Sequence, residues 1–389
     1  MSGKKYLNEI IQQIPPSGIR KYFDLASQME GVVSLGVGEP DFETPWHIRE
    51  EAIYAIKSGK TFYTSNVGLP QLRKEICNYY RRRFNVSYKW DKECMVTVGG
   101  SEAIDIVMRT ILNPGDEVIL LQPGYVAYEP LVRLAGGVPV IIELKEENKF
   151  KLTAEELQSA ISDKTKMLFI NFPGNPTGGS MSREDYEKIV PIIKQHDFVV
   201  LTDEIYAELS YGNEFCTIAS FEEIKEQVII INGFSKAYSM TGWRVGYLLA
   251  DEEIIKSMNK IHQYCIMCPS TISQYAAVEA AAHGDADCKL HHDSFEGRRN
   301  FIVNGLNRIG LKCHMPEGAF YVFPSIKSTG LTSDEFCEQL LNTEKVAVVP
   351  GTAFGGCGEG YIRISYAYSI DEIKEALTRI ERFLNSLKK

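Results

Sequence analysis

Apolar and polar positions alternate in a regular way through the middle of the chain. Seven short runs rich in β-branched and other apolar residues lie between residues 94 and 250, separated by longer segments with helical patterns. The runs are 94–98, 118–121, 138–144, 167–170, 198–201, 228–231 and 245–249. This alternation predicts an α/β fold with a mostly parallel seven-stranded sheet covered by helices. Ligands of such sheets bind beyond the carboxyl ends of the strands, so the residues directly after each run are the most informative about function.

The two ends of the chain show a different pattern. Helical patterns at 294–309 and 369–387 accompany short apolar runs at 319–323 and 361–365. With 389 residues, the chain also exceeds the roughly 250–300 residues at which a single core stops growing. We therefore predict a large domain over residues 46–289 and a smaller α+β domain made of residues 1–45 and 290–389.

Composition narrows the choice of partners. The net charge of −9 opposes nonspecific attraction to nucleic acid or anionic lipid. The N-terminus has no apolar stretch of signal-peptide length, and no run of about 18 apolar residues occurs in the chain. We expect a cytoplasmic protein with small-molecule partners. The nine cysteines are scattered, and the Cys265-x-x-Cys268 pair has no second pair or histidine cluster nearby, so we expect free thiols and no metal site.

Four polar segments follow predicted strands. They read GGSEA at 99–103, NFPGNPTG at 171–178, DEIY at 203–206 and SKAYSMTGWR at 235–244. In this order and spacing they resemble the class I/II aminotransferases of the fold-type I pyridoxal-phosphate family. The resemblance runs from about Gly36 to Ala367, which is most of the chain. It implies the fold-type I transferase architecture and pyridoxal 5′-phosphate as cofactor.

A lysine is the centre of this resemblance. A lysine ammonium with a reference pKa of roughly 10.4 is no nucleophile at neutral pH, whereas a buried lysine near cations loses its proton and forms a Schiff base. Lys236 occupies the position of the family's imine-forming lysine, and Arg244 follows it in S-K-x5-G-W-R. The resemblance implies that Lys236 binds the cofactor covalently and, once released by the substrate, acts as general base. The alternative is a solvated surface lysine.

The cofactor ring requires a carboxylate that keeps its nitrogen protonated. Asp203 ends the apolar run at 198–202 and fits that role, although a helix N-cap is the common alternative for such an aspartate. In the family, the residues matching Tyr206 and Asn175 donate hydrogen bonds to the phenolate oxygen of the ring. Tyr125 matches the aromatic residue that stacks on the pyridine face. The alternatives are core packing for the tyrosines and a turn for Asn175.

The cofactor phosphate requires backbone N–H groups and cations, and a Gly-Gly turn that opens a helix supplies N–H groups at its positive end. Gly100, Ser101 and Glu102 form such a turn. As the family uses them, Ser235 would add a hydroxyl group and Arg244 a charged fork.

Three more positions follow from the resemblance. Tyr63 matches the tyrosine that reaches the phosphate of the neighbouring subunit, which implies a homodimer with shared active sites. Arg363, in Y-I-R-I-S, matches the arginine that binds the substrate α-carboxylate in a bidentate manner. Gly38 matches the glycine whose backbone borders the substrate. The alternatives are a surface arginine and a turn glycine.

The implied reaction is a ping-pong transfer of an amino group from an L-amino acid to a 2-oxo acid such as 2-oxoglutarate, through a Lys236 aldimine. Aromatic, aspartate-type and N-acetyl-diaminopimelate donors all remain open. Ser101 stands where many bacterial aspartate aminotransferases of this group carry lysine, and Ile19 stands where a small polar residue is frequent. Ser101 makes an aspartate donor less favoured, and Ile19 favours an apolar or aromatic donor.

Two other functions are alternatives to transamination. A carbon–sulfur β-lyase of the cystathionine type would keep the cofactor and expel a thiol, and sequence separates it poorly from a transaminase. A regulator on the same scaffold would need a fused DNA-binding domain, and none is recognisable before Ser34. We therefore expect an enzyme, with transamination favoured.

Overall fold

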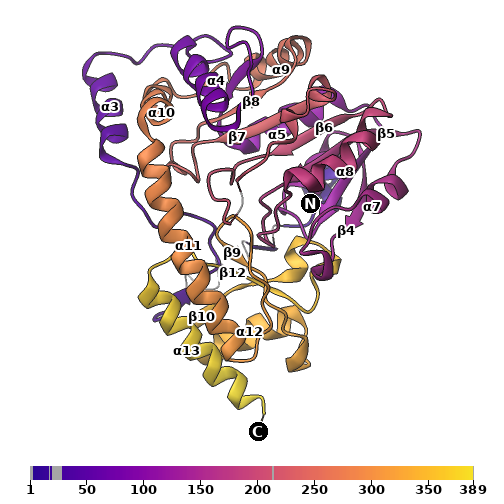
Figure 1. The fold of residues 1–389 in the computed structure, drawn as a ribbon, viewed down its shortest axis with the longest axis vertical. Helices are drawn as coiled ribbons and strands as arrows, with labels where there is room; N and C mark the ends of the chain where they lie inside the picture. Colours follow the sequence, from indigo (N-terminus) through magenta and orange to yellow (C-terminus); the bar gives the residue numbers. More distant parts are fainter. Residues whose placement is uncertain (1–2, 17, 20–28, 213, 389) are drawn as a thin grey trace.

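The structure is a computed structural model that describes residues 3–16, 18–19, 29–212 and 214–388. Its central feature is a seven-stranded sheet with the order β2-β8-β7-β6-β5-β3-β4 (Figure 1). Only β8 runs antiparallel to its neighbours. The strands are β2 (Cys94–Thr97), β3 (Glu117–Gln122), β4 (Val138–Glu143), β5 (Thr165–Asn171), β6 (Val199–Asp203), β7 (Val228–Gly233) and β8 (Gly246–Leu249). The predicted mostly parallel seven-stranded sheet is confirmed.

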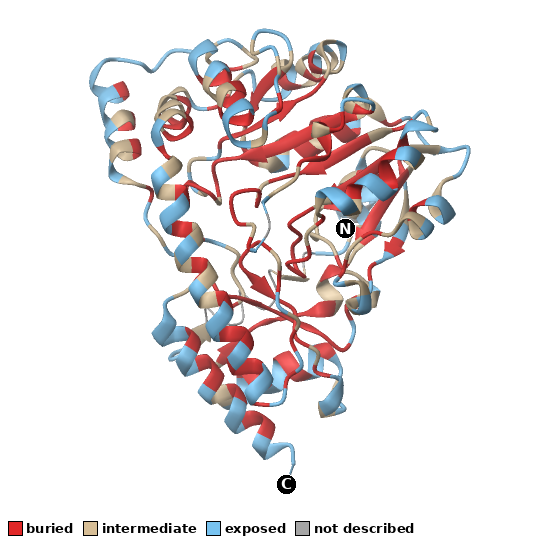
Figure 2. Cartoon of the chain, in the orientation of Figure 1, coloured by how far each residue is buried: buried red, intermediate tan, exposed pale blue. Residues whose placement is uncertain are grey.

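Both faces of the sheet are buried except along the edge strand β4, which explains why the inner strands are continuously apolar. In β5, Met167 and Phe169 pack into one hydrophobic cluster, whereas Leu168 and Ile170 pack into another. Successive side chains of a strand point to opposite faces, so a run without polar alternation requires cover on both sides. Figure 2 shows most of the sheet as buried, with exposed residues on the outer surfaces of the helices.

Helices from the first three quarters of the chain provide that cover. They include α5 against β7 and β8, α9 against α5 and β2, and α10 against α3 and α4. Their bounds are α1 (Glu9–Gln13), α3 (Trp46–Lys57), α4 (Pro70–Phe84), α5 (Gly99–Ile111), α6 (Tyr128–Leu134), α7 (Ala154–Ala160), α8 (Arg183–Lys194), α9 (Glu252–Cys265) and α10 (Thr271–His283). Within the described residues, no helix has the length and apolar character needed to cross a membrane.

The remaining elements form a second region below the large sheet in Figure 1. Its helices α11, α12 and α13 enclose a separate hydrophobic core around an antiparallel sheet of order β11-β12-β9 and a parallel β1-β10 pair. The bounds are β1 (Val33–Ser34), α11 (Asp285–Arg308), β9 (Tyr321–Val322), α12 (Ser333–Glu344), β10 (Val346–Ala347), β11 (Val349–Pro350), β12 (Ile362–Ser365) and α13 (Ile370–Ser386).

Helix α11 begins earlier than the sequence pattern predicts. Its first nine residues, DADCKLHHD, are mostly polar and carry no clear apolar period, so the helical pattern is recognisable only from residue 294. The predicted domain boundary at residue 290 lies within this helix. The division into residues 46–289 and 1–45 with 290–389 stays a prediction.

Candidate active site

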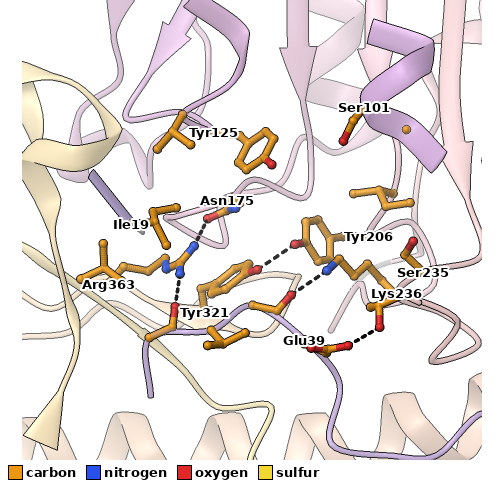
Figure 3. Close-up of a pocket in the computed structure, with 18 of the residues that line it drawn as sticks. Ile19, Glu39, Ser101, Tyr125, Asn175, Tyr206, Ser235, Lys236, Tyr321 and Arg363 are labelled. Atoms are coloured by element: carbon orange, nitrogen blue, oxygen red, sulfur yellow. Dashed lines mark hydrogen bonds between the residues drawn. The ribbon is translucent and has the colours of Figure 1, made fainter. Parts of the chain in front are cut away.

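A cavity of about 500 Å³ lies where the sheet and the second region meet. Its walls come from the carboxyl ends of β5 and β6, the loop after β7, the first turn of α5, the segment after β1, and β12 (Figure 3). This is the place at which parallel sheets bind ligands.

Lys236 lies in the loop after β7, and its amine reaches into the cavity. Its Nζ donates a hydrogen bond of 2.6 Å to the carbonyl oxygen of Gly38. Burial lowers the pKa of Lys236 to about 8; the nearby Arg363 and Arg244 act in the same direction, and Glu39 opposes them. A lysine with this pKa supplies a neutral, nucleophilic amine near neutral pH.

Asp203 ends β6 with its carboxylate in the cavity. Its Oδ2 accepts a hydrogen bond of 2.8 Å from the Tyr128 hydroxyl, and its Oδ1 accepts one of 3.1 Å from the Ile205 amide. Burial raises the pKa of Asp203 to about 6. No helix begins directly after Asp203 in the described chain, so the N-cap alternative does not apply. A buried carboxylate in this position suits a protonated ring nitrogen.

Arg363 is buried, with 2% of its surface exposed, and its hydrogen-bond partners among the described residues are neutral. The guanidinium donates to Asn175 Oδ1 at 3.0 Å and to the Gly36 carbonyl, while its Nε has no partner (Figure 3). Burial lowers the pKa of Arg363. A buried guanidinium without a carboxylate partner is suited to bind the carboxylate of a ligand.

Tyr321 joins this arginine to Tyr206. The Arg363 guanidinium lies 4.5 Å from the Tyr321 ring centroid, and the two tyrosine hydroxyls are 2.9 Å apart. A Cβ on Gly38 would lie 2.0 Å from the Tyr321 hydroxyl oxygen, so this close approach requires glycine. These contacts bring the predicted residues Asn175, Tyr206 and Arg363 to one side of the cavity.

The start of α5 has no side-chain cap, in contrast to α8, α12 and α13, which each begin with a capping box. Gly99 has a φ of +71°, and a Cβ there would lie 2.4 Å from Arg244 Nη2. A Cβ on Gly246 would lie 2.5 Å from the Gly99 carbonyl carbon. The two glycines thus allow β8 and the Arg244 guanidinium to approach the first turn of α5. Free N–H groups beside a guanidinium form a cradle suited to a phosphate.

The donor set therefore fits pyridoxal phosphate. The cavity combines a buried carboxylate, a half-buried lysine, the cradle at α5 and the hydroxyl groups of Ser101 and Ser235. Tyr125 lines the same cavity, and its ring packs edge-on against Tyr128. These groups match the charges of a pyridinium nitrogen, an aldehyde carbon and a phosphate.

Comparison with known proteins agrees with this chemistry. The profile of the family described as aminotransferase class I and II matches residues 30–380. The putative aminotransferase YugH of Bacillus subtilis is 52% identical over 380 residues, which cover 98% of each chain. The probable N-acetyl-LL-diaminopimelate aminotransferase of the same organism is 43% identical, over 97% of this chain and 95% of its own length. The chain belongs to the class I and II aminotransferases.

A solved structure extends the agreement to the fold. The aspartate aminotransferase of Thermus thermophilus with maleate has a TM-score of 0.93 at 37% identity, covering 98% of this chain and 100% of its own. The protein is a pyridoxal-phosphate-dependent transaminase with small-molecule substrates. The family, fold type and cofactor predicted from the sequence are confirmed.

The aminotransferase brings most of the predicted site residues together. Those that line the cavity are Ile19, Gly38, Gly100, Ser101, Tyr125, Asn175, Asp203, Tyr206, Ser235, Lys236, Arg244 and Arg363. Their individual roles stay predictions.

Two predicted residues lie outside the cavity. The Glu102 carboxylate accepts a hydrogen bond from the Val98 amide and lies 2.7 Å from His262 Nδ1, so a contact with the phosphate would involve its backbone alone. Tyr63 is 81% exposed and would need a second subunit to bring it to an active site.

Some residues of the site were not singled out in the sequence. Tyr128 bonds to Asp203 and Tyr321 bonds to Tyr206, whereas Glu39 and Thr241 line the cavity and bond to each other. Tyr128 could have been identified from the sequence, because it is the second tyrosine of the P-G-Y-V-A-Y segment that contains Tyr125. Tyr321 offered no local signal, because its contact with Tyr206 joins residues 115 positions apart.

Proposed function

We propose that this aminotransferase transfers the amino group of an L-amino acid with an apolar or aromatic side chain to a 2-oxo acid such as 2-oxoglutarate. The proposal is supported by the apolar residues among those that line the cavity: Ile19, Val37, Val126, Val348 and Val349. The cations among the described lining residues are Lys236, Arg244 and Arg363. Each already has a proposed role, in proton transfer, phosphate binding and α-carboxylate binding respectively. A distal carboxylate on the donor would lack a partner among these residues and would be costly to bury.

Each charged residue has a distinct part in this function. When bound, pyridoxal phosphate withdraws electrons from the Cα of the donor. Arg363 holds the α-carboxylate, and Asp203 keeps the ring nitrogen protonated. Lys236 removes the proton from Cα of the donor and delivers it to the carbon of the cofactor that takes up the amino group. The lowered pKa of Lys236 favours this proton transfer. Asn175 and Tyr206 orient the ring through its oxygen.

Donor competition tests the substrate class. Initial rates with 2-oxoglutarate are compared for L-phenylalanine, L-aspartate and N-acetyl-diaminopimelate, with Lys236→Ala as the inactive control. We expect kcat/KM for L-phenylalanine to exceed that for L-aspartate by at least roughly tenfold. The reverse order would overturn the proposed donor class. A Lys236→Ala protein that still transaminates at the wild-type rate would overturn the proposed catalytic role.

We also propose a homodimer in which Tyr63 contributes to the active site of the partner subunit. Support comes from exposed aromatic side chains on and after α3: Trp46, Tyr54, Phe62 and Tyr63 are 58%, 61%, 81% and 81% exposed. Several large exposed aromatic side chains within one stretch of the chain are typical of an interaction surface. Sedimentation equilibrium should give a dimer mass, and Tyr63→Ala should weaken cofactor retention without dissociating the subunits. A monomeric, fully active enzyme would contradict this proposal.

A further inference from the structure

Residues 38–44 form an irregular segment between β1 and α3, yet side chains fix it to two other parts of the chain. One is the lysine loop, residues 235–244, and the other is α11. We propose that His291 of α11 is a positioning residue for the reaction: it sets where the Lys236 amine stands relative to Gly38. This inference rests on the proposed role of Lys236 as the group that moves the Cα proton.

The first contact of His291 is with the main chain of the lysine loop. His291 is 4% exposed, and its Nδ1 lies 3.0 Å from the carbonyl oxygen of Ala237, the residue directly after Lys236. A carbonyl oxygen only accepts hydrogen bonds, so Nδ1 carries the proton. Burial lowers the pKa of His291, which favours the neutral ring. The peptide next to Lys236 is therefore fixed from α11.

The second contact is with the segment itself. The imidazole of His291 stacks on Phe42 with ring centroids 4.4 Å apart and an interplanar angle of 18°. Arg298, on the same helix, lies 5.0 Å from the Phe42 ring centroid and forms an ion pair of 2.7 Å with Asp41. Helix α11 thus holds residues 41 and 42 from one side.

The lysine loop holds the segment from the other side. Lys236 Nζ donates to the Gly38 carbonyl at 2.6 Å, and the Thr44 hydroxyl donates to the Ser239 carbonyl at 2.6 Å. When the Lys236 amine is free, as it is after the substrate has released it, the contacts form a closed circuit from Lys236 through Gly38 and Phe42 to His291, and back through Ala237. The buried His291 ring thus contacts both the residue after Lys236 and the segment that carries Gly38. The relative position of these two parts of the chain sets the distance between the lysine amine and the glycine.

This circuit gives His291 a role beyond packing. A displacement of about 1 Å at a reacting group lowers rates by as much as roughly 100-fold. Loss of the His291 bond leaves the Ala237 carbonyl with the longer contact of 3.7 Å from the Cys288 thiol and so loosens the peptide beside Lys236. The ring stack on Phe42 survives if an aromatic side chain replaces the imidazole. The two contacts can therefore be separated by substitution.

The test uses the holoenzyme with three variants. His291→Phe keeps the stack and removes the donor, and Phe42→Leu removes the stack and keeps the donor. His196→Phe is the matched control, because His196 also stacks on a phenylalanine, Phe198, with an interplanar angle of 18°, and does not line the cavity. The measurements are kcat, donor KM, the isotope effect with an α-deuterated donor, the pH midpoint of the cofactor's visible absorbance, and thermal unfolding.

We expect His291→Phe to lower kcat by roughly 10- to 100-fold, with a smaller change in KM, a larger α-deuterium effect and a shifted pH midpoint. Phe42→Leu should change the same quantities less, and it carries the test if His291→Phe fails to fold. His196→Phe should leave them all unchanged. A variant of His291 or Phe42 that lowers only the unfolding temperature would overturn the inference. Activity in Lys236→Ala would instead overturn the proposed function.

Discussion

Asp203 and Glu204 are neighbouring buried carboxylates at the end of β6, and their side chains point in different directions. They are 7% and 1% exposed, and burial raises the pKa of Asp203 to about 6 and that of Glu204 to about 7. Asp203 lines the cavity and bonds to Tyr128. Glu204 faces the core, where it accepts hydrogen bonds from the hydroxyls of Thr217 and Tyr80.

The comparison shows that burial and a raised pKa do not by themselves mark a functional carboxylate. Both groups share these properties, but only Asp203 has part of its surroundings open to a ligand. The Glu204 carboxylate is enclosed by hydroxyl donors from α4 and from the loop after β6, so it joins elements of the large sheet region. Access to the cavity therefore distinguishes Asp203, the carboxylate predicted to contact the cofactor, from Glu204.

Substitution of each carboxylate by its isosteric amide should give the largest difference in kcat/KM between the two positions. Asp203→Asn should lower kcat/KM by roughly 100- to 1000-fold, the range typical when a preorganised charge is removed from a reacting centre. Glu204→Gln should change kcat/KM by less than about fivefold, a factor that corresponds to roughly 1 kcal/mol. Steady-state rates of the two variants measured side by side test this. Equal losses would show that the difference in direction has no functional meaning.

Removal of the Tyr128 hydroxyl group, which donates a hydrogen bond to Asp203, should have a smaller effect. Tyr128→Phe removes a hydrogen bond that stabilises the ionised carboxylate, so the pKa of Asp203 should rise further. We expect cofactor affinity to fall by up to roughly tenfold, the equivalent of one lost hydrogen bond to a charged group. Equilibrium dialysis of the cofactor against wild type and Tyr128→Phe gives the ratio. Unchanged affinity would mean that this bond does not support the ring contact.

Glu204 should appear instead in the pH dependence of stability. Its pKa in the folded protein, about 7, is above its ordinary value of 4.5, so the folded state binds the proton more tightly than the unfolded chain. This contribution is fully present below pH 4.5 and is lost as the pH rises through about 7. The free energy of unfolding of the cofactor-free wild type should therefore fall relative to Glu204→Gln between these values. A pH-independent difference in urea unfolding would contradict the assignment.

Sequence predicted the features that depend on local pattern. The seven strands were recognisable because continuous apolar runs are required when a sheet is buried on both faces. Asp203 was predicted to lie at the ligand-binding edge of the sheet because it ends such a run. The start of α11 was not recognisable, because its first residues are polar. The pattern also could not show that Glu102 turns to His262, or that His291 reaches Ala237, because these contacts join distant segments.

A single-turnover experiment tests the central claim most directly. The holoenzyme is mixed with an excess of L-phenylalanine in the absence of any oxo acid, and the products and the cofactor spectrum are recorded. A transaminase should release one equivalent of 2-oxo acid per active site, retain the amino group on the cofactor, and recover its original spectrum only when 2-oxoglutarate is added. In a parallel reaction with cystathionine, continued release of pyruvate and ammonia through expulsion of the thiol, without any oxo-acid acceptor, would contradict transamination and identify a lyase.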